Sequence, residues 1–260
     1  VISVISGTSA GAMNAVVLAD GFQKDGRDGA RAALRHFWHD ASRAAWLSLI
    51  QRTPWDRLTG NWRMNNSPGY LVADLLTRVA SPYDLNPLGL NPLQDFLAEH
   101  VDFDAVRGCS TVKLFIPATN VRTGRVRVFR NHELSPSAVM ASACLPNLFP
   151  AVEIDGEGYW DGGYSGNPAL HPLIYNCDVR DIVIVQINPI VVPDIPRTAR
   201  DILDRVNEIT FNSSLLAELR AIRFVVRQLE AGHLDPAQYK HMLIHRINGE
   251  AELGGLGASS

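Results

Sequence analysis

Apolar residues open the chain in a short run and then change to helical spacing. Residues 1–5 (Val-Ile-Ser-Val-Ile) have the composition of a buried strand, and the small and apolar residues over 12–19 favour a helix directly after it. Over 27–52, apolar residues recur at steps of three and four. This spacing predicts a further helix with one buried face.

The rest of the chain alternates strands and helices. The stretch 181–188 is apolar except at its ends, which predicts a buried strand. A long helix over 197–231 is expected to end at Gly232, with an apolar stripe formed by Ile202, Val206, Ile209, Leu216, Leu219, Val226 and Leu229. Other predicted elements are strands over 112–118 and 125–130, a hairpin turning at Asp155-Gly156, helices over 70–80, 92–100 and from Pro136, and an irregular segment over 53–69. The interleaving predicts an α/β fold whose mostly parallel sheet has helices on both faces.

Composition limits the class of protein. The chain has 260 residues, 46% of them apolar, and we expect one domain over 1–260. The net charge of −3 gives no reason to expect a nucleic-acid partner. No apolar stretch approaches the ~20 residues that a membrane-spanning helix needs.

The three cysteines are odd in number and widely spaced, so a disulfide framework is not expected. No CxxC pair and no Cys/His cluster indicates zinc, and neither a metal nor a cofactor is expected. This cysteine usage fits a reducing compartment. A cytoplasmic or peripheral membrane location is the expectation, and secretion stays an open question.

Gly7-Thr8-Ser9-Ala10-Gly11 lies between the first predicted strand and the first predicted helix. A GxSxG sequence in that context is typical of a nucleophile elbow, a strained turn that presents one serine hydroxyl. We expect Ser9 at positive φ, with small neighbours where strand and helix pass close together. The helix N-terminus would favour an anion at the serine oxygen.

A nucleophilic serine needs a base, which could be a histidine, a lysine or a carboxylate. None of the eight histidines has a sequence context that marks it as catalytic. The best-marked acid is Asp161, which ends the second strand of the predicted hairpin and precedes Gly162 and Gly163. We expect Asp161 to be exposed on a permissive loop that can approach a neighbouring element closely. A turn-capping role for Asp161 is the alternative.

Taken together, these motifs resemble the patatin-like phospholipases. The resemblance covers nearly the whole chain: GTSAG after an apolar strand, Asp161-Gly162-Gly163 about 150 residues later, and between them the segment 141–150 (ASACLPNLFP). It implies a three-layer α/β/α fold and a lipid acyl hydrolase that uses Ser9 as nucleophile and Asp161 as general base. Gly7, Ala10, Gly11, Gly162 and Gly163 would support the elbow and the oxyanion, and no cofactor is implied.

The sequence departs from the family pattern at its start. Members carry a glycine-rich loop before the elbow strand, whose N–H groups build the oxyanion hole, and this sequence shows no such loop. We therefore expect a chain that is incomplete at both ends and is weakly active or inactive as it stands.

Lipid or phospholipid is the expected partner, with contact at a membrane surface. Four tryptophans fall within 25 residues, and four arginines gather near the 125–130 strand. For both groups the pattern favours ordinary helix packing and a solvated strand face over a lipid contact. Two further hypotheses stay open: a Ser–His–Asp esterase using His171, His233, His241 or His245, and a catalytically inactive lipid-binding fragment. The oligomeric state cannot be read from the sequence.

Overall fold

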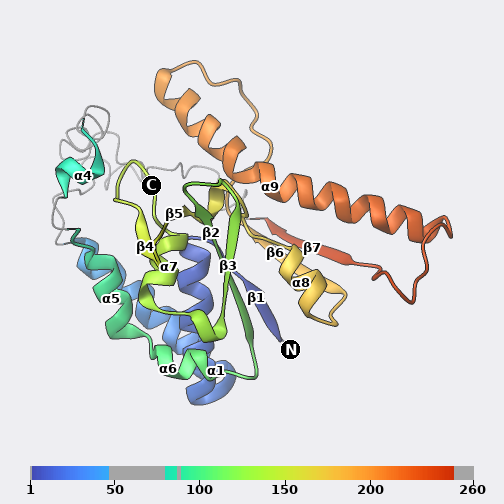
Figure 1. The fold of residues 1–260 in the computed structure, drawn as a ribbon, viewed down its shortest axis with the longest axis horizontal. Helices are drawn as coiled ribbons and strands as arrows, with labels where there is room; N and C mark the ends of the chain where they lie inside the picture. The colour runs from blue at the N-terminus through green and yellow to red at the C-terminus, as the bar shows by residue number, and fades with distance from the viewer. Residues whose placement is uncertain (1, 47–79, 87–88, 249–260) are drawn as a thin grey trace.

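The structure is a computed structural model that describes residues 2–46, 80–86 and 89–248 (Figure 1). Some predictions lie outside these residues: the irregular segment 53–69, nearly all of the helix over 70–80, and Trp55 and Trp62.

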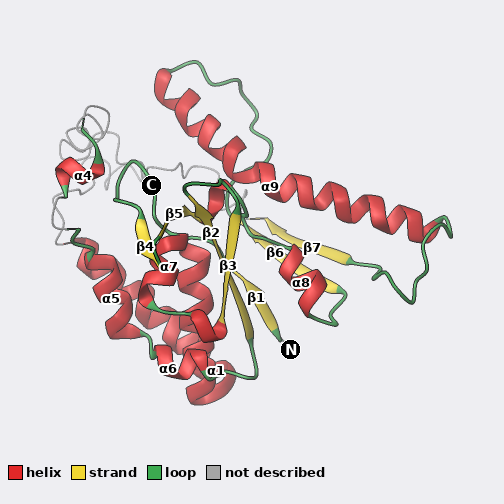
Figure 2. Cartoon of the chain, viewed as in Figure 1, coloured by secondary structure: helices red, strands yellow, loops and turns green. Residues whose placement is uncertain are grey.

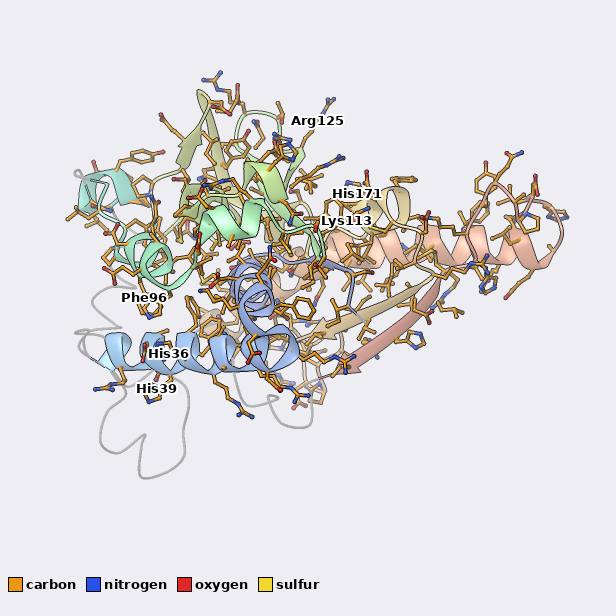
Figure 3. All side chains as sticks on the ribbon, turned by 90° about the horizontal axis from the view of Figure 1, so that it is seen from below. His36, His39, Phe96, Lys113, Arg125 and His171 are labelled. Atoms are coloured by element: carbon orange, nitrogen blue, oxygen red, sulfur yellow. The ribbon has the colours of Figure 1, made fainter. Side chains whose placement is uncertain are left out.

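The N-terminal strand β1 (Val4–Ser6) leads directly into α1 (Ala10–Trp46). The two helices predicted here are both present as the two halves of α1, which meet at a kink at Asp25 and Gly26, whose backbone angles are not helical. Gly26 has φ of 52°, a conformation that glycine adopts without steric cost. The kink places the second half of α1 at a steep angle to the first (Figure 3).

Strand β2 (Lys113–Asn120) organises the main sheet. It pairs in parallel with β1 and antiparallel with β3 (Val126–Arg130) and β5 (Glu157–Asp161). Strand β5 also pairs antiparallel with β4 (Val152–Ile154). The sheet of these described strands is therefore mixed, which corrects the expectation of mostly parallel strands. The hairpins β2–β3 and β4–β5 enforce antiparallel pairing because their loops are too short for a crossover.

The shorter helices agree with the local sequence signals. Ser135 caps α7 (Pro136–Ser142) by accepting a hydrogen bond from the Ala138 N–H at 3.1 Å, as expected for Ser followed by Pro. The others are α4 (Pro82–Leu85), α5 (Pro92–His100), α6 (Phe103–Arg107), α8 (His171–Asn176) and the short 3-10 turns η2 (Asn131–Glu133) and η3 (Gly162–Tyr164).

Two hydrophobic cores lie on opposite faces of the main sheet. The helices that cover these faces are drawn in Figure 2. Along β2, Leu114 and Ile116 face the core formed with α1, α5, α6 and α7, whereas Phe115 faces the core formed with α8 and α9 (Ala199–Glu230). Alternate residues of a strand point to opposite faces, so one strand supplies both cores. The predicted α/β class, with helices on both faces of the sheet, is confirmed.

The C-terminal strands form a separate sheet. Strand β6 (Asp181–Gln186) pairs in parallel with β7 (Leu243–Asn248). Ile182 and Ile184 are buried, but Val183 and Val185 are 58% and 70% exposed. The continuous apolar run therefore does not mean burial on both faces among the described residues, contrary to the prediction.

Helix α9 ends close to the predicted position, and Gly232 follows it at φ of 73°. Its buried contacts differ from the predicted stripe. Leu215 and Ile222 are buried in the core, and Leu219 and Val226 of the predicted stripe pack against it. The first part of the helix leaves its apolar residues exposed, namely Ile202, Val206 and Ile209. The stripe fails there because that part of the helix extends beyond the sheet (Figure 1).

Candidate active site

Ser9 occupies a strained turn between β1 and α1. Its φ is 55°, the positive value expected at this position and rare for a residue with a side chain. The Gly7 N–H donates to the Phe115 carbonyl at 3.1 Å, which ties the turn to β2. A Cβ at Gly7 would lie 2.2 Å from the Gly11 carbonyl oxygen, so this position accepts glycine alone. The turn thus holds Ser9 at the N-terminus of α1.

The two small residues after Ser9 differ in their surroundings. A Cβ at Gly11 would meet no neighbouring atom within 4 Å, so close packing does not require glycine there, contrary to the expectation. Ala10 is exposed, and its N–H has no hydrogen-bond partner among the described residues. A free N–H at the start of a long helix is a donor available to a developing anion.

Asp161 is fully buried, which corrects the prediction of an exposed loop position. Its backbone N–H donates to the Cys144 carbonyl at 2.8 Å, and its carbonyl accepts from the Thr119 hydroxyl at 2.8 Å. Its Oδ1 accepts from the Gly163 N–H at 2.7 Å. The residue is buried because β5 continues in the sheet up to this position and η3 then folds over it.

Both glycines after Asp161 are sterically required. A Cβ at Gly162 would lie 2.2 Å from the Pro117 carbonyl oxygen, and one at Gly163 would lie 2.1 Å from the Phe211 ring. The close approach expected of this backbone is therefore present, against β2 on one side and α9 on the other.

The register of β2 explains why Ser9 and Asp161 meet. Strand β3 pairs along one edge of β2, so β1 and β5 share the other edge. Strand β1 ends opposite Phe115, and β5 comes from the opposite direction and ends opposite Ala118. The two strands therefore point at each other, and their terminal turns converge beside the residues between these positions.

Burial is the main influence on the ionisation of Asp161. It raises the pKa of this carboxyl to about 6, although the hydrogen bond from Gly163 and the nearby Ser9 hydroxyl act in the opposite direction. Oδ2 is buried and makes no hydrogen bond among the described residues. The Ser9 hydroxyl lies near enough to the Asp161 carboxyl for a weak hydrogen bond that favours its charged form. Such hydrogen bonds often tighten only when a substrate is bound.

Three polar residues that the sequence did not single out hold the two turns in place. Ser142 accepts from the Ser9 N–H at 3.1 Å, Thr8 donates to the Gly166 carbonyl at 2.7 Å, and Ser6 donates to the Ala169 carbonyl at 2.7 Å. Ser142 is completely buried. It belongs to the 141–150 segment that carries the family resemblance, which is the only sequence signal pointing to it.

The histidines contact other partners. His171 lies 3.7 Å from a Glu218 carboxylate oxygen, and His245 lies 2.8 Å from one of Asp181. Within the part of the chain that the structure describes, no hydrogen bond or ion pair joins a histidine to Ser9 or Asp161. The Ser–His–Asp alternative therefore has no support from the described geometry.

Cys144 lies close to Asp161 without competing as a nucleophile. Burial is the main cause that raises the pKa of its thiol to about 11, and the Asp161 charge adds to the rise. A thiol in this state stays protonated at neutral pH and is a poor nucleophile. Among the described residues, the group of side chains able to share a metal ion lies elsewhere, on α1 and α5.

The arginines near β3 are partly neutralised. Arg127 forms an ion pair with Glu133, and Arg122 lies 3.7 Å from a Glu157 oxygen. Arg125 projects away from the body of the molecule (Figure 3). Trp38 is 41% exposed and donates to the Asn14 side chain at 2.7 Å.

Comparison with known proteins identifies the class. The patatin-like phospholipase family matches residues 1–174, which include both Ser9 and Asp161. The chain therefore belongs to this family, whose members act as lipid acyl hydrolases. A comparison with curated proteins found no match. Helix α9 and strands β6 and β7 lie beyond the matched region.

Among the described helices, none combines the length and apolarity required to cross a membrane.

Proposed function

We propose that the protein hydrolyses fatty-acyl esters of lipids through a Ser9–Asp161 dyad. The observation that carries this proposal is the convergence of two constrained turns: Ser9 at positive φ on the N-terminus of α1, beside the buried carboxyl of Asp161, whose Oδ2 makes no hydrogen bond with any described residue. A pKa of about 6 leaves Asp161 ionised at neutral pH and basic enough to accept a proton.

In the first half of the reaction, Ser9 Oγ attacks the ester carbonyl carbon while its proton passes to Asp161. The tetrahedral intermediate expels the alcohol, which takes that proton, and an acyl-Ser9 ester remains. In the second half, Asp161 accepts a proton from water as the water attacks the acyl carbon. The proton then returns to Ser9 as the fatty acid leaves.

The oxyanion of each tetrahedral intermediate needs hydrogen-bond donors. The Ala10 N–H and the N-terminus of α1 are the donors that the described residues offer beside Ser9. One such donor is typically worth ~10²–10³ in rate.

The proposal is tested by comparing Ser9→Ala and Asp161→Asn with wild type on a nitrophenyl ester and on phospholipid vesicles. Both variants should lose at least about 10²–10³ in kcat/KM, because each removes one half of the dyad. Ser213→Ala on α9 and Asp155→Asn in the β4–β5 turn are matched controls that should retain activity. Full activity in either dyad variant would contradict the assignment.

The covalent step has a separate readout. A fluorophosphonate should attach to Ser9 of the wild-type protein, with the adduct located by peptide mass spectrometry. Labelling at a different serine would overturn the assignment of the nucleophile even if the protein hydrolyses esters.

A further inference from the structure

Three metal-ligating side chains meet where the second half of α1 crosses α5, and the proposed ester chemistry uses none of them. His36 and Asp40 are four residues apart on α1, and His100 is the last residue of α5. Nε2 of His36 lies 3.3 Å from Asp40 Oδ2, and Nε2 of His100 lies 3.4 Å from the same oxygen. The three ligand atoms all lie within 4.8 Å of one another.

The surroundings orient these atoms. His100 Nδ1 lies 2.8 Å from the Phe96 carbonyl, to which it donates, so Nε2 of a neutral ring carries the lone pair and faces Asp40. Asp40 Oδ1 is occupied by His39 Nδ1 at 3.1 Å, which leaves Oδ2 for His36 and His100. Backbone carbonyls and neighbouring polar groups orient metal-binding imidazoles and carboxylates in this way.

The contact between the His100 ring and the Asp40 carboxylate calls for a cation. With His100 neutral, its Nε2 lone pair faces a carboxylate oxygen at 3.4 Å, and a proton or a metal ion must bridge them. Ligands at ~2.0–2.1 Å in a tetrahedral site are about 3.3–3.4 Å apart. The two distances to Asp40 Oδ2 match this separation.

We propose that His36, Asp40 and His100 bind a divalent transition-metal ion, with Zn²⁺ as the best fit. Two imidazoles and one carboxylate are a donor set that suits Zn²⁺, with water in the fourth position. His36 is mostly exposed, whereas His100, at the end of α5, is largely buried against Phe37 of α1 (Figure 3 shows His36 and His39 on α1 with Phe96 nearby). The ion would fasten the second half of α1 to α5. No sequence motif predicts this, because His100 is 60 residues from Asp40.

The test is titration of the purified, chelator-treated protein with Zn²⁺ alone, followed by calorimetry and by thermal unfolding. Wild type should bind one Zn²⁺, and saturation at about 100 times Kd should raise the unfolding midpoint by roughly 5–10 °C. Co²⁺ in place of Zn²⁺ should give the intense visible bands of a tetrahedral complex. His36→Ala, Asp40→Asn and His100→Gln should each weaken binding at least about tenfold.

His132→Ala, which removes an exposed histidine on η2, is the matched control and should bind Zn²⁺ as wild type does. The side chain of His36 is mostly exposed and that of Asp40 is partly exposed, so their variants keep the test valid if His100→Gln misfolds, which circular dichroism would detect. Absence of stoichiometric binding would mean that a proton bridges these groups and would overturn the proposal. Binding that survives His36→Ala and Asp40→Asn unchanged would overturn it as well.

Discussion

Asp161 combines complete burial with a carboxyl that the proposed chemistry needs in its charged form. The protein opposes the desolvation with the Gly163 N–H and the Ser9 hydroxyl, but the pKa still rises from 3.8 to about 6. The difference of about 2 units corresponds to roughly 3 kcal/mol. Because the pKa of Asp161 is higher in the folded state, its carboxyl contributes to stability while the pH is below the pKa of the unfolded chain. This contribution is lost as the pH rises through the pKa of the folded state, about 6.

The pKa of Asp161 predicts the pH dependence of the activity. A general base must be ionised, so kcat/KM should fall about tenfold per unit as pH drops below about 6, and it should level off above pH 7. A pH–rate profile on a neutral nitrophenyl ester checks this without interference from substrate titration. A profile that is flat between pH 5 and pH 8 would contradict the role of Asp161.

Removing the charge of Asp161 should stabilise the fold. Asp161→Asn keeps an oxygen acceptor for the Gly163 N–H but avoids an ionised group in the core. We expect a gain of about 1–3 kcal/mol at pH 8 and little gain at pH 4, where the native carboxyl is already neutral. Urea unfolding at the two pH values measures it, with Asp155→Asn as the control. A gain of equal size at both values would refute the electrostatic explanation.

At the scale of elements, the packing of the β1–α1 turn requires glycine at Gly7 but not at Gly11. A methyl group at Gly7 would collide with the Gly11 backbone, whereas one at Gly11 would enter open space. Gly7→Ala should therefore cost at least about 3 kcal/mol of unfolding free energy, and Gly11→Ala should change it by less than about 1 kcal/mol. Chemical denaturation of the two variants makes the comparison. Equal destabilisation would show that the turn does not pack as described.

Helix α7 also contacts the nucleophile elbow through a side-chain hydrogen bond. Ser142 lies on α7, and its bond to the Ser9 N–H joins that helix to the elbow. Ser142→Ala should cost about 1–3 kcal/mol because it leaves a donor without its partner. It should also lower kcat more than it raises KM, since it acts through the position of Ser9. Steady-state kinetics with the nitrophenyl ester separate the two effects.

Strand β6 provides a contrast between its two faces. Ile184 is buried, and Val185 beside it is 70% exposed. Ile184→Thr should cost about 2 kcal/mol or more, while Val185→Thr should stay within about 0.5 kcal/mol. The same urea titration measures both variants, and a large cost at Val185 would show that its face is covered in solution.

At the scale of the whole molecule, β2 joins the two cores and aligns the two strands that end at the site. Phe115 and Ile116 are neighbours in sequence but pack into different cores. Because one strand supports both, we expect the described part of the chain to unfold as one unit.

This expectation is tested with Phe115→Ala and Ile116→Ala. Each should cost roughly 2–5 kcal/mol, and each should shift the whole transition. Tryptophan fluorescence and far-UV circular dichroism should give coincident unfolding curves for both variants. Two separate transitions would contradict a shared structural unit.

Local patterns determined much of this protein. The positive φ of Ser9, the cap at Ser135, the turn at Asp155-Gly156 and the helix 92–100 depend on neighbouring residues alone, so the sequence predicts them well. The nature of the site also follows from local motifs, because GTSAG and Asp161-Gly162-Gly163 carry the family resemblance.

The tertiary structure decided what depends on residues distant in sequence. Strand direction, the burial of Asp161, the bond from the Ser9 N–H to Ser142 and the meeting of His36 with His100 follow from strand register and helix crossing. The periodicity of apolar residues identifies the face of a strand or helix that can be buried, but it does not show whether another element covers that face. For this reason the sequence predicts more burial in β6 and at the start of α9 than the structure shows. Burial, and with it the pKa of Asp161, is a property of the assembled layers, because desolvation depends on every element that surrounds the group.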